Sequence, residues 1–272
     1  MSVNSLNLPN LDGIYGMAAN PLRQVFMMGV VWFLANQRKG LYLDLLEVGS
    51  WGGASALTWG QGLELHNNSL GGITCIDAWR PYYTPDTIFD ELSKEINDAL
   101  LGEEPYKIFL KNIEYVHPKI DMTIHKGWSS DIFPKLKQSS FDMIYIDGDH
   151  SYENVSVDIE AACKLIKEGG IICGDDLELQ GHQVDTSIIK KIPYLDKYMD
   201  QESGIVFHPG VTQAVKEIFG DVSSWYGFWA IQKVNADWRE ISLTGMPPNI
   251  PRYITGKNLI ELKALMMKHG IL

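Results

Sequence analysis

Short apolar segments alternate with segments of helical length along most of this 272-residue chain, and this alternation constrains its fold more than any other feature. The strands that we expect cover residues 41–48, 71–79, 121–127, 141–147, 171–175 and 228–234. Nearly continuous apolar strands joined by helices are typical of a parallel sheet that is covered on both faces. Right-handed crossovers then bring the carboxyl ends of the strands to one edge. We therefore predict an α/β fold with a doubly wound, mostly parallel sheet of seven strands.

The same pattern suggests how the chain is divided. Residues 1–40 form an N-terminal helical segment, and residues 41–234 form the domain that contains the sheet. Two polar or proline-punctuated insertions, residues 80–118 and 177–208, are expected to fold over the edge where the strands end. Residues 235–272 form a tail that finishes in an amphipathic helix.

Composition argues against several classes of function. The net charge is -11, whereas nucleic-acid binding requires clustered lysine and arginine, so we expect no nucleic-acid partner. The longest apolar run, residues 25–35, is shorter than the roughly 20 residues that cross a bilayer. Three cysteines without CxxC spacing are typical of a reduced, cytoplasmic protein. The apolar segment 22–38 and the tail helix offer apolar faces, from which we expect a homo-oligomer, a dimer or larger.

A glycine-rich turn follows the first expected strand. Its spacing is E-x-G-x-x-x-G-x-S, formed by Glu47, Gly49, Gly53 and Ser55. Glycine allows a positive φ and a close approach of the backbone to a ligand. The turn is not G-x-G-x-x-G, because position 51 is Trp, and this disfavours a dinucleotide. Glu47 would repel a phosphate and attract an ammonium group. A ligand with a ribose and an amino acid end therefore fits the turn better.

Asp77 ends the second expected strand, about 30 residues after the glycine turn begins. A carboxylate at this place accepts hydrogen bonds from ribose hydroxyls in dinucleotide-binding folds. The alternative is that Asp77 only caps a turn or a helix. Beside the glycine turn, the ribose role is the one that we favour.

Acidic residues and a histidine follow two further strands. Asp147 and His150 come after the fourth strand, and Asp175 and Asp176 end the fifth. Neighbouring strands lie about 4.8 Å apart, so carboxylates at their ends can share one ion. Three carboxylates without a cysteine ligand suit Mg²⁺, or Mn²⁺. The alternative is that these aspartates cap turns and helices.

His150 is the natural general base of this cluster, because an imidazole with a pKa of about 6.5 accepts a proton near neutral pH. The alternative is a surface or capping histidine. His182 and His208 are weaker candidates, and we expect structural roles for both.

Three segments in this order, LEVGSWGGAS, CIDAW and GWSSDIFPKL, resemble the motifs of class I S-adenosylmethionine-dependent methyltransferases. The resemblance covers roughly residues 41–234 and implies a Rossmann-like methyltransferase fold. The residues that it implies for binding S-adenosylmethionine are Glu47, Gly49, Ser50, Gly53, Ser55, Asp77, Gly127, Trp128, Ser129 and Asp147.

The spacing D-x-x-H, followed later by a pair of aspartates, resembles a metal-dependent subset of that superfamily. This subset includes the sugar O-methyltransferases of macrolide biosynthesis and the cephalosporin-hydroxylase-like proteins. The resemblance implies that Asp147, Asp175 and Asp176 are metal ligands, and that His150 acts with Asp147 in catalysis. Macrolide-type members tend to read DGD-x-Y-E-S-T, whereas this chain reads DGDHSYEN, which leaves the substrate and the choice of base open.

We therefore expect an S-adenosylmethionine-dependent O-methyltransferase that is assisted by Mg²⁺ or Mn²⁺ and acts on a small polyhydroxylated acceptor. A sugar of a glycoconjugate or natural product is the leading acceptor. One alternative is an iron-dependent oxygenase, although its usual ligands are two histidines and one carboxylate, and only one histidine stands in the cluster. Another is a non-catalytic homologue that binds the cofactor. A dehydrogenase is disfavoured by the missing G-x-G-x-x-G.

Overall fold

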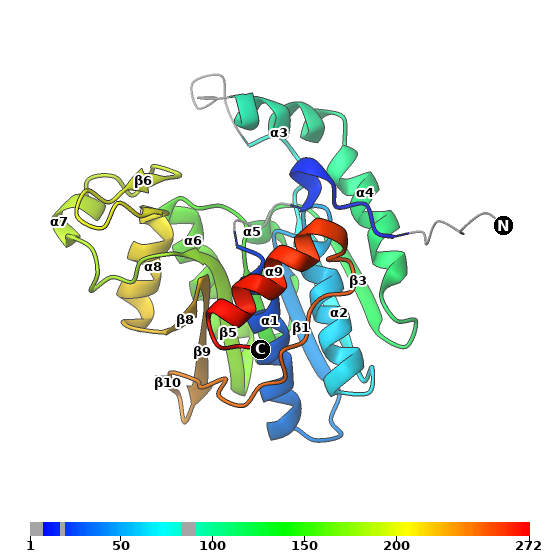
Figure 1. Cartoon of the computed structure of the whole chain (residues 1–272). Helices are drawn as coiled ribbons and strands as arrows, with labels where there is room; N and C mark the ends of the chain where they lie inside the picture. Colours follow the sequence, from blue (N-terminus) through cyan, green and yellow to red (C-terminus); the bar gives the residue numbers. More distant parts are fainter. Residues whose placement is uncertain (1–7, 17–19, 83–90) are drawn as a thin grey trace.

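The structure is a computed structural model in which residues 8–16, 20–82 and 91–272 are described (Figure 1). These residues form one mixed sheet of eight strands with helices on both faces, and a separate sheet of two strands. The predicted α/β fold with a doubly wound, mostly parallel sheet is confirmed.

The parallel part of the sheet contains five strands. In spatial order they are β3 (Asp121–Lys126), β2 (Gly71–Asp77), β1 (Leu43–Val48), β4 (Phe141–Ile146) and β5 (Ile166–Leu177). Because all five run in the same direction, their carboxyl ends meet at one edge. This is the edge at which ligands bind in open α/β sheets.

The remaining strands of the large sheet are antiparallel. β9 (Gly227–Val234) pairs with β5, while β10 (Asp237–Arg239) and β8 (Ser223–Trp225) each pair with β9. The sequence predicted β9 but missed β8 and β10, because each of these two strands spans only three residues and has no periodicity of its own. A small hairpin of β6 (Tyr198–Met199) and β7 (Val206–Phe207) forms the second sheet.

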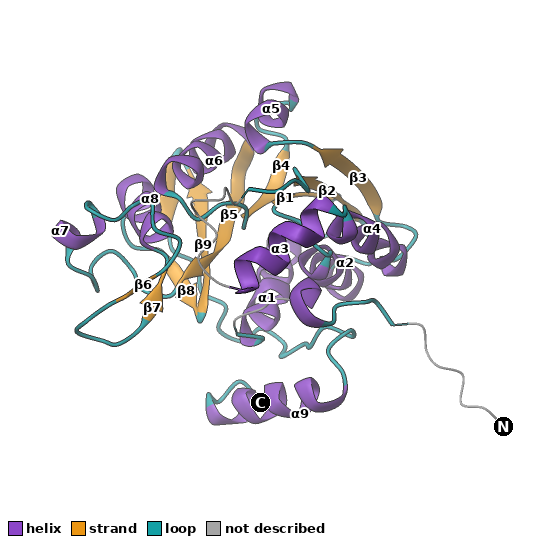
Figure 2. Cartoon of the chain, turned by 90° about the horizontal axis from the view of Figure 1, so that it is seen from above, coloured by secondary structure: helices purple, strands orange, loops and turns teal. Residues whose placement is uncertain are grey.

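The described helices surround the sheet as Figure 2 shows. They are α1 (Leu22–Gln37), α2 (Ala54–His66), α3 (Glu91–Leu101), α4 (Glu104–Asn112), α5 (Ser129–Ile132), α6 (Tyr152–Leu165), α7 (Thr186–Ile189), α8 (Pro209–Phe219) and α9 (Gly256–Lys268), with 3-10 turns at Gly13–Gly16 (η1), Ile113–Tyr115 (η2) and Phe133–Lys135 (η3).

Alternate residues of the strands supply two hydrophobic cores. Leu45 and Met143 point into the core that α1 and α2 cover, whereas Leu46 and Ile144 point into the core that α6 and α8 cover. This alternation is the period of a strand whose two faces are both buried. The packing fixes which way each residue at the strand ends points.

The end of α6 differs from the prediction. We expected a helix to about Lys167 that Gly169 and Gly170 would close, but α6 ends at Leu165 and both glycines lie inside β5. A Cβ on Gly170 would lie 3.0 Å from the Asp142 carbonyl oxygen. The pairing of β4 and β5 is also irregular at this point. These glycines therefore permit a close approach of two strands, and they do not cap a helix.

The C-terminal helix packs against α1. Leu22 and Val25 of α1 share a buried cluster with Leu262 and Met266 of α9. The two apolar faces on which the expectation of a homo-oligomer rested thus cover each other within one chain. Within the described part of the chain, no helix is long and apolar enough to cross a membrane.

The division into segments stays a prediction. The expected insertion 80–118 holds α3, α4 and η2, and its residues 83–90 lie outside the described part. Residues 178–208 carry α7 and the small hairpin, which Figure 1 shows next to α8.

Candidate active site

The glycine-rich turn joins β1 to α2 and passes directly against the end of β4. Gly49 has φ +87°, and a Cβ at this residue would lie 1.8 Å from the Asp147 carbonyl oxygen. Gly53 has φ +91° and caps the N-terminus of α2. Only glycine combines this backbone conformation with this close approach. The two glycines of the predicted turn are therefore required by the fold itself.

Asp77 holds the glycine turn against the end of β2. Its Oδ2 accepts a hydrogen bond from the Trp51 amide at 2.8 Å, and its Oδ1 accepts one from the Trp79 amide at 2.7 Å. Burial raises the pKa of Asp77 against the lowering effect of these amides. The turn-capping role that we weighed is thus present. The contact with ribose hydroxyls stays a prediction.

Glu47 is fully buried in this structure. Neither of its carboxylate oxygens has a hydrogen-bond partner. Burial raises the pKa of Glu47, although nearby Ser50, Ser55 and Cys75 oppose the shift. The contact of Glu47 with a ligand ammonium stays a prediction. Ser50 and Ser55 are buried with it.

The segment predicted to flank the adenine follows β3. The Gly127 amide donates to the Asp77 carbonyl at 2.9 Å, and the Trp128 side chain is 45% exposed. The Ser129 hydroxyl donates to Asp158 of α6 at 2.6 Å. Burial raises the pKa of Asp158 to about 6. Trp128 is thus the exposed one of these three residues. Ser129 is hydrogen-bonded to Asp158, an acid that the sequence analysis did not single out.

Two distant segments close around the glycine turn. The Trp51 indole donates to the Ile14 carbonyl of η1 at 2.7 Å. Asn112, at the end of α4, donates to the Gly52 carbonyl at 2.7 Å and to the Asn10 carbonyl at 2.8 Å. The N-terminal segment and the helical insertion therefore both contact the turn that the sequence assigns to the cofactor.

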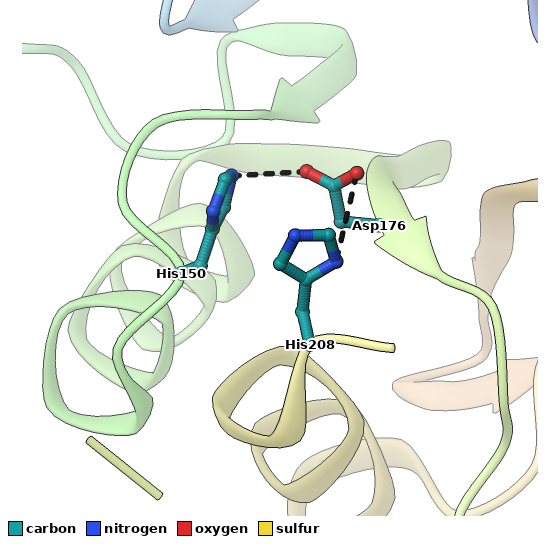
Figure 3. A group of neighbouring side chains, drawn as sticks. All are labelled: His150, Asp176 and His208. Carbon is teal, nitrogen blue, oxygen red and sulfur yellow. Dashed lines mark ion pairs between the residues drawn. The ribbon is translucent and has the colours of Figure 1, made fainter. Parts of the chain in front are cut away.

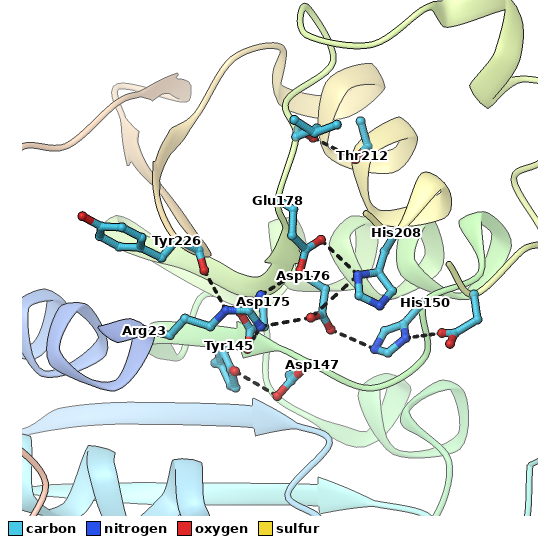
Figure 4. A network of polar contacts seen from close by, with 12 residues as sticks. Arg23, Tyr145, Asp147, His150, Asp175, Asp176, Glu178, His208, Thr212 and Tyr226 are labelled. Carbon is cyan, nitrogen blue, oxygen red and sulfur yellow. Dashed lines mark hydrogen bonds and ion pairs between the residues drawn. The ribbon is translucent and has the colours of Figure 1, made fainter. Parts of the chain in front are cut away.

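The predicted acidic residues lie together at the ends of β4 and β5 (Figure 4). Asp147, Asp175 and Asp176 line a cavity of about 10 Å³ together with His150. A cavity of this size holds about one water molecule or one ion. The Tyr145 hydroxyl donates to Asp147 at 2.9 Å. The predicted neighbourhood of the three carboxylates is therefore present.

Arg23 of α1 reaches into this cluster and was not singled out from the sequence. Its Nη1 lies 2.8 Å from Asp175 Oδ2 and 3.0 Å from Asp176 Oδ1, and its Nη2 lies 2.7 Å from Glu178. A Cβ on Gly227 would lie 2.3 Å from Nη2, so that glycine makes room for the guanidinium. The only sequence signal was an arginine within an apolar helix, where a buried charge needs a partner.

His150 lies between two carboxylates. Its Nε2 is 2.9 Å from Asp176 Oδ2, and its Nδ1 is 2.6 Å from Asp196 Oδ1. Burial lowers the pKa of His150, but the two carboxylates outweigh it and raise the pKa well above its ordinary value. The two carboxylates thus favour the protonated form of His150, and each of its ring nitrogens faces one of them. Asp196, from the segment after β5, is a partner that sequence reasoning missed.

The carboxylates of the cluster are unequally compensated. Burial and the charges of Asp175 and Asp176 raise the pKa of Asp147 well above its usual range. Burial and Asp176 raise the pKa of Asp175 to about 7, although Arg23 lowers it. Asp175 Oδ1 is also buried without a hydrogen-bond partner. Burial alone would raise the pKa of Asp176 too, but His150, His208 and Arg23 bring it far below its usual range. Asp175 therefore shares its one cationic partner, Arg23, with Asp176, and no ion pair in the described residues reaches Asp147. Carboxylates that are buried together with so little positive charge are typical of a cation site.

The ligand geometry differs from the predicted one. Within the described residues, the group whose ligand atoms all lie within 4.8 Å of one another is His150, Asp176 and His208 (Figure 3). Asp147 and Asp175 are not part of it. The reason is that Asp175 turns toward Arg23, and Asp147 toward a tyrosine hydroxyl. His208, to which we gave a structural role, joins the cluster from the start of α8.

The fold and this edge define the class of protein. A doubly wound sheet, whose first strand leads into the glycine turn and whose second ends in the acid that holds the turn, is the architecture of a class I S-adenosylmethionine-dependent methyltransferase. Residues 46–177 match the family described as a methyltransferase domain. This part of the chain is thus a methyltransferase domain, and the resemblance stated from the sequence is confirmed.

One solved O-methyltransferase shares this fold, and two further solved structures are less similar to the chain. The O-methyltransferase NovP is 15% identical over 79% of this chain and 81% of that chain, with a TM-score of 0.51. Cofactor-bound Rv0187 from MTB is 17% identical over 85% of this chain and 84% of that chain, with a TM-score of 0.48. An O-methyltransferase from Bacillus cereus in complex with SAH is 18% identical over 80% and 83%, with a TM-score of 0.44. No curated protein matches the chain.

Proposed function

We propose that this protein transfers the methyl group of S-adenosylmethionine to a hydroxyl oxygen of a small polyhydroxylated acceptor, with the assistance of a divalent cation. A sugar of a glycoconjugate or natural product is the leading acceptor. The observation that carries the proposal is the pair of under-compensated carboxylates, Asp147 and Asp175, directly beside the glycine turn. NovP, whose fold this chain shares, is an O-methyltransferase.

The cofactor would lie along the glycine turn and the carboxyl ends of the first strands. Bound S-adenosylmethionine supplies a sulfonium methyl group, so that the new O–CH₃ bond forms as the S–CH₃ bond breaks. The glycine backbone of the turn at Gly49 and Gly53, which has no side chain in the way, and the exposed Trp128 offer the surface for it. Asp77 fixes the turn through its two hydrogen bonds, so the cradle is organised before the ligand arrives.

Asp147, Asp175 and Asp176 would hold Mg²⁺ or Mn²⁺. Their donor chemistry fits such an ion, because all three are oxygen ligands that line one ion-sized cavity and the pKa values of Asp147 and Asp175 are raised. A bound divalent cation polarises a hydroxyl group and lowers its pKa. Arg23 balances part of the remaining negative charge.

His150 is the residue that would accept the proton of the acceptor hydroxyl at Nε2. Asp196 orients the ring through Nδ1 at 2.6 Å. In the present arrangement the charge of Asp176 keeps a proton on the imidazole. Once that charge is compensated, the pKa of His150 falls toward the range in which a base operates.

The test is an assay of S-adenosylhomocysteine formation with a panel of nucleotide sugars and glycosides. We expect turnover with at least one polyhydroxylated acceptor, loss of turnover in EDTA and recovery with Mg²⁺. We also expect His150→Ala to reduce the rate much more than it weakens cofactor binding. Turnover that EDTA leaves intact would exclude the metal-assisted mechanism, and an equal loss of rate and binding would make His150 structural.

A further inference from the structure

Two histidines that are far apart in the sequence meet beside the acidic cluster. His150 follows β4 and His208 precedes α8, and their ring centroids lie 4.5 Å apart at an interplanar angle of 60°. The proposed methyl transfer uses His150 and gives no role to His208. His208 is nevertheless buried, with 7% of its side chain exposed.

Each of the two rings is anchored by its own carboxylate. His150 Nδ1 lies 2.6 Å from Asp196 Oδ1, and His208 Nδ1 lies 3.1 Å from Glu178 Oε2 (Figure 4). A histidine that binds a metal almost always donates its other N–H to a carboxylate, a carbonyl or water, which fixes the tautomer and the ring orientation. In this pair both Nδ1 positions are engaged in that manner. An ion would therefore be held through the two Nε2 atoms, of which that of His208 has no partner and that of His150 faces Asp176.

A single carboxylate completes the group. Asp176 Oδ2 lies 2.9 Å from His150 Nε2, whereas its Oδ1 lies 3.0 Å from Arg23 Nη1. Arg23 thus holds Oδ1, which also lies 3.8 Å from His208 Nδ1, and Oδ2 is directed to His150. The ligand atoms of His150, Asp176 and His208 all lie within 4.8 Å of one another (Figure 3).

An unpartnered nitrogen points to a ligand at this place. His208 Nε2 is buried and has no hydrogen-bond partner. Figure 3 shows the ring of His208 facing His150 and Asp176. A buried polar atom without a partner destabilises the folded state and is rare in folded proteins. An ion between the three side chains would satisfy it.

We propose that His150, Asp176 and His208 form a second cation position, next to the carboxylate cavity, which takes a divalent transition ion of the zinc class and thereby withdraws His150 from methyl transfer. Two imidazole nitrogens and one carboxylate suit Zn²⁺, Fe²⁺ or Co²⁺, whereas Mg²⁺ prefers oxygen ligands. The ion occupies the Nε2 lone pair of His150, so the position is inhibitory. The inhibition rests on the proposed function, and the binding of the ion does not.

The first experiment uses Co²⁺ as a spectroscopic probe of the full-length protein. We expect visible absorption bands that report nitrogen ligation, and His208→Ala should weaken Co²⁺ binding about 10- to 100-fold. His208→Gln serves as a second variant that keeps a polar side chain. His182→Ala is the matched control, because His182 also pairs with a carboxylate, Asp221, but lies on the surface. Circular dichroism verifies that each variant is folded.

Asp147→Asn separates the two cation positions. It should leave Co²⁺ binding intact, because Asp147 is not among the three ligands. The proposal is overturned if both His208 variants bind Co²⁺ like the wild type. It is equally overturned if Asp147→Asn loses Co²⁺ as His208→Ala does, since that places the ion on the carboxylates.

The second experiment measures Zn²⁺ inhibition of methyl transfer in the presence of Mg²⁺. We expect the wild type to be inhibited, and His208→Ala to need at least about tenfold more Zn²⁺ for the same fractional inhibition. Equal Zn²⁺ sensitivity of the two proteins would overturn the inhibitory role. If Co²⁺ binds as expected while no acceptor is methylated, the proposed function fails and the ion site stands. If an acceptor is methylated while the His208 variants bind Co²⁺ like the wild type, the proposed function stands and the ion site fails.

Discussion

An aspartate lies near each end of strand β4, and the two have very different surroundings. Asp142, near its start, is buried, whereas Asp147, just after its end, is half-buried. Asp142 Oδ1 lies 2.7 Å from Arg38, while its Oδ2 lies 2.8 Å from Lys167 and accepts from the Asp44 amide at 2.8 Å. Asp147, at the other end, is hydrogen-bonded by the Tyr145 hydroxyl and faces further carboxylates. The fold thus supplies cationic partners for Asp142, whereas it compensates the charge of Asp147 far less.

The balance of charge at the two edges of the sheet follows the same division. At the edge where β4 begins, Asp142 and Asp44 are matched by Arg38 and Lys167. At the opposite edge, the carboxylates that surround Asp147 outnumber the cationic groups of Arg23 and His150. A complete network stabilises, whereas a buried excess of one sign costs stability and is typical of a site that binds a charged ligand. The comparison predicts different consequences for the same substitution at each edge.

The largest expected effect is a loss of stability at the edge of the sheet that contains Asp142. Asp142→Asn removes the partner of Arg38 and Lys167, and we expect the free energy of unfolding to fall by about 3 kcal/mol. Urea denaturation measures this. Asp44→Asn is the matched control, because Asp44 is more exposed and should cost less than about 1 kcal/mol. A loss below about 1 kcal/mol for Asp142→Asn would remove the basis of the comparison.

At the edge that contains Asp147, we expect a substitution to reduce activity and not stability. Asp147→Asn replaces an acid of raised pKa by a neutral amide of similar shape, so we expect the free energy of unfolding to stay the same or to rise. Turnover should fall about 100-fold or more, because a cation ligand is lost. Steady-state kinetics and urea denaturation of the same preparation check both parts. If stability falls together with turnover, Asp147 is a structural residue like Asp142.

For Asp158, a further buried aspartate, we expect a smaller effect, which depends on pH. Burial raises the pKa of Asp158 to about 6, and Ser129 is its hydrogen-bond donor. The raised pKa means that the folded state favours the protonated acid. Its contribution to stability is therefore complete below the unfolded pKa of about 4 and is lost as the pH rises through about 6. Relative to Asp158→Asn, the wild type should lose roughly 2 kcal/mol between pH 4 and pH 7. Parallel pH profiles of unfolding for the two proteins would refute this.

The smallest effect is expected at the surface. His182 Nδ1 lies 2.9 Å from Asp221, and both side chains are more than half exposed. An exposed pair contributes little, so His182→Ala should change the free energy of unfolding by less than about 0.5 kcal/mol and leave turnover unchanged. Thermal unfolding and the methyltransferase assay suffice for the measurement. A clear loss of turnover would mean that the active site extends further over the segment after β5 than we describe.

The parts of the fold that follow from local pattern could be predicted from the sequence. The apolar runs predicted the parallel strands, and the spacing of Gly49 and Gly53 predicted the tight turn. Asp147 and Asp175 were predicted to meet because parallel strands end at one edge. Gly169 and Gly170 misled us, since a pair of glycines marks a helix end and a close strand approach equally well.

The partners of the cluster were missed because they come from distant parts of the chain. Arg23 contacts Asp176 across 153 positions, and His150 contacts Asp196 across 46, separations that no periodicity reports. Glu47 is a different case, because the alternation along β1 already places it on the face of Leu45, inside the core. The burial of Glu47 could therefore be predicted from the strand period, whereas its contact with a ligand ammonium stays a prediction.

The most direct test of the central claim is calorimetric titration of the folded protein with S-adenosylhomocysteine, with and without Mg²⁺, and with NAD⁺ as the comparison ligand. The structure predicts that S-adenosylhomocysteine binds with micromolar affinity and that NAD⁺ does not bind, because the turn at Gly49 and Gly53 lacks the dinucleotide spacing. Failure of S-adenosylhomocysteine to bind a folded sample would contradict the assignment of the glycine turn, and with it the proposed methyl transfer.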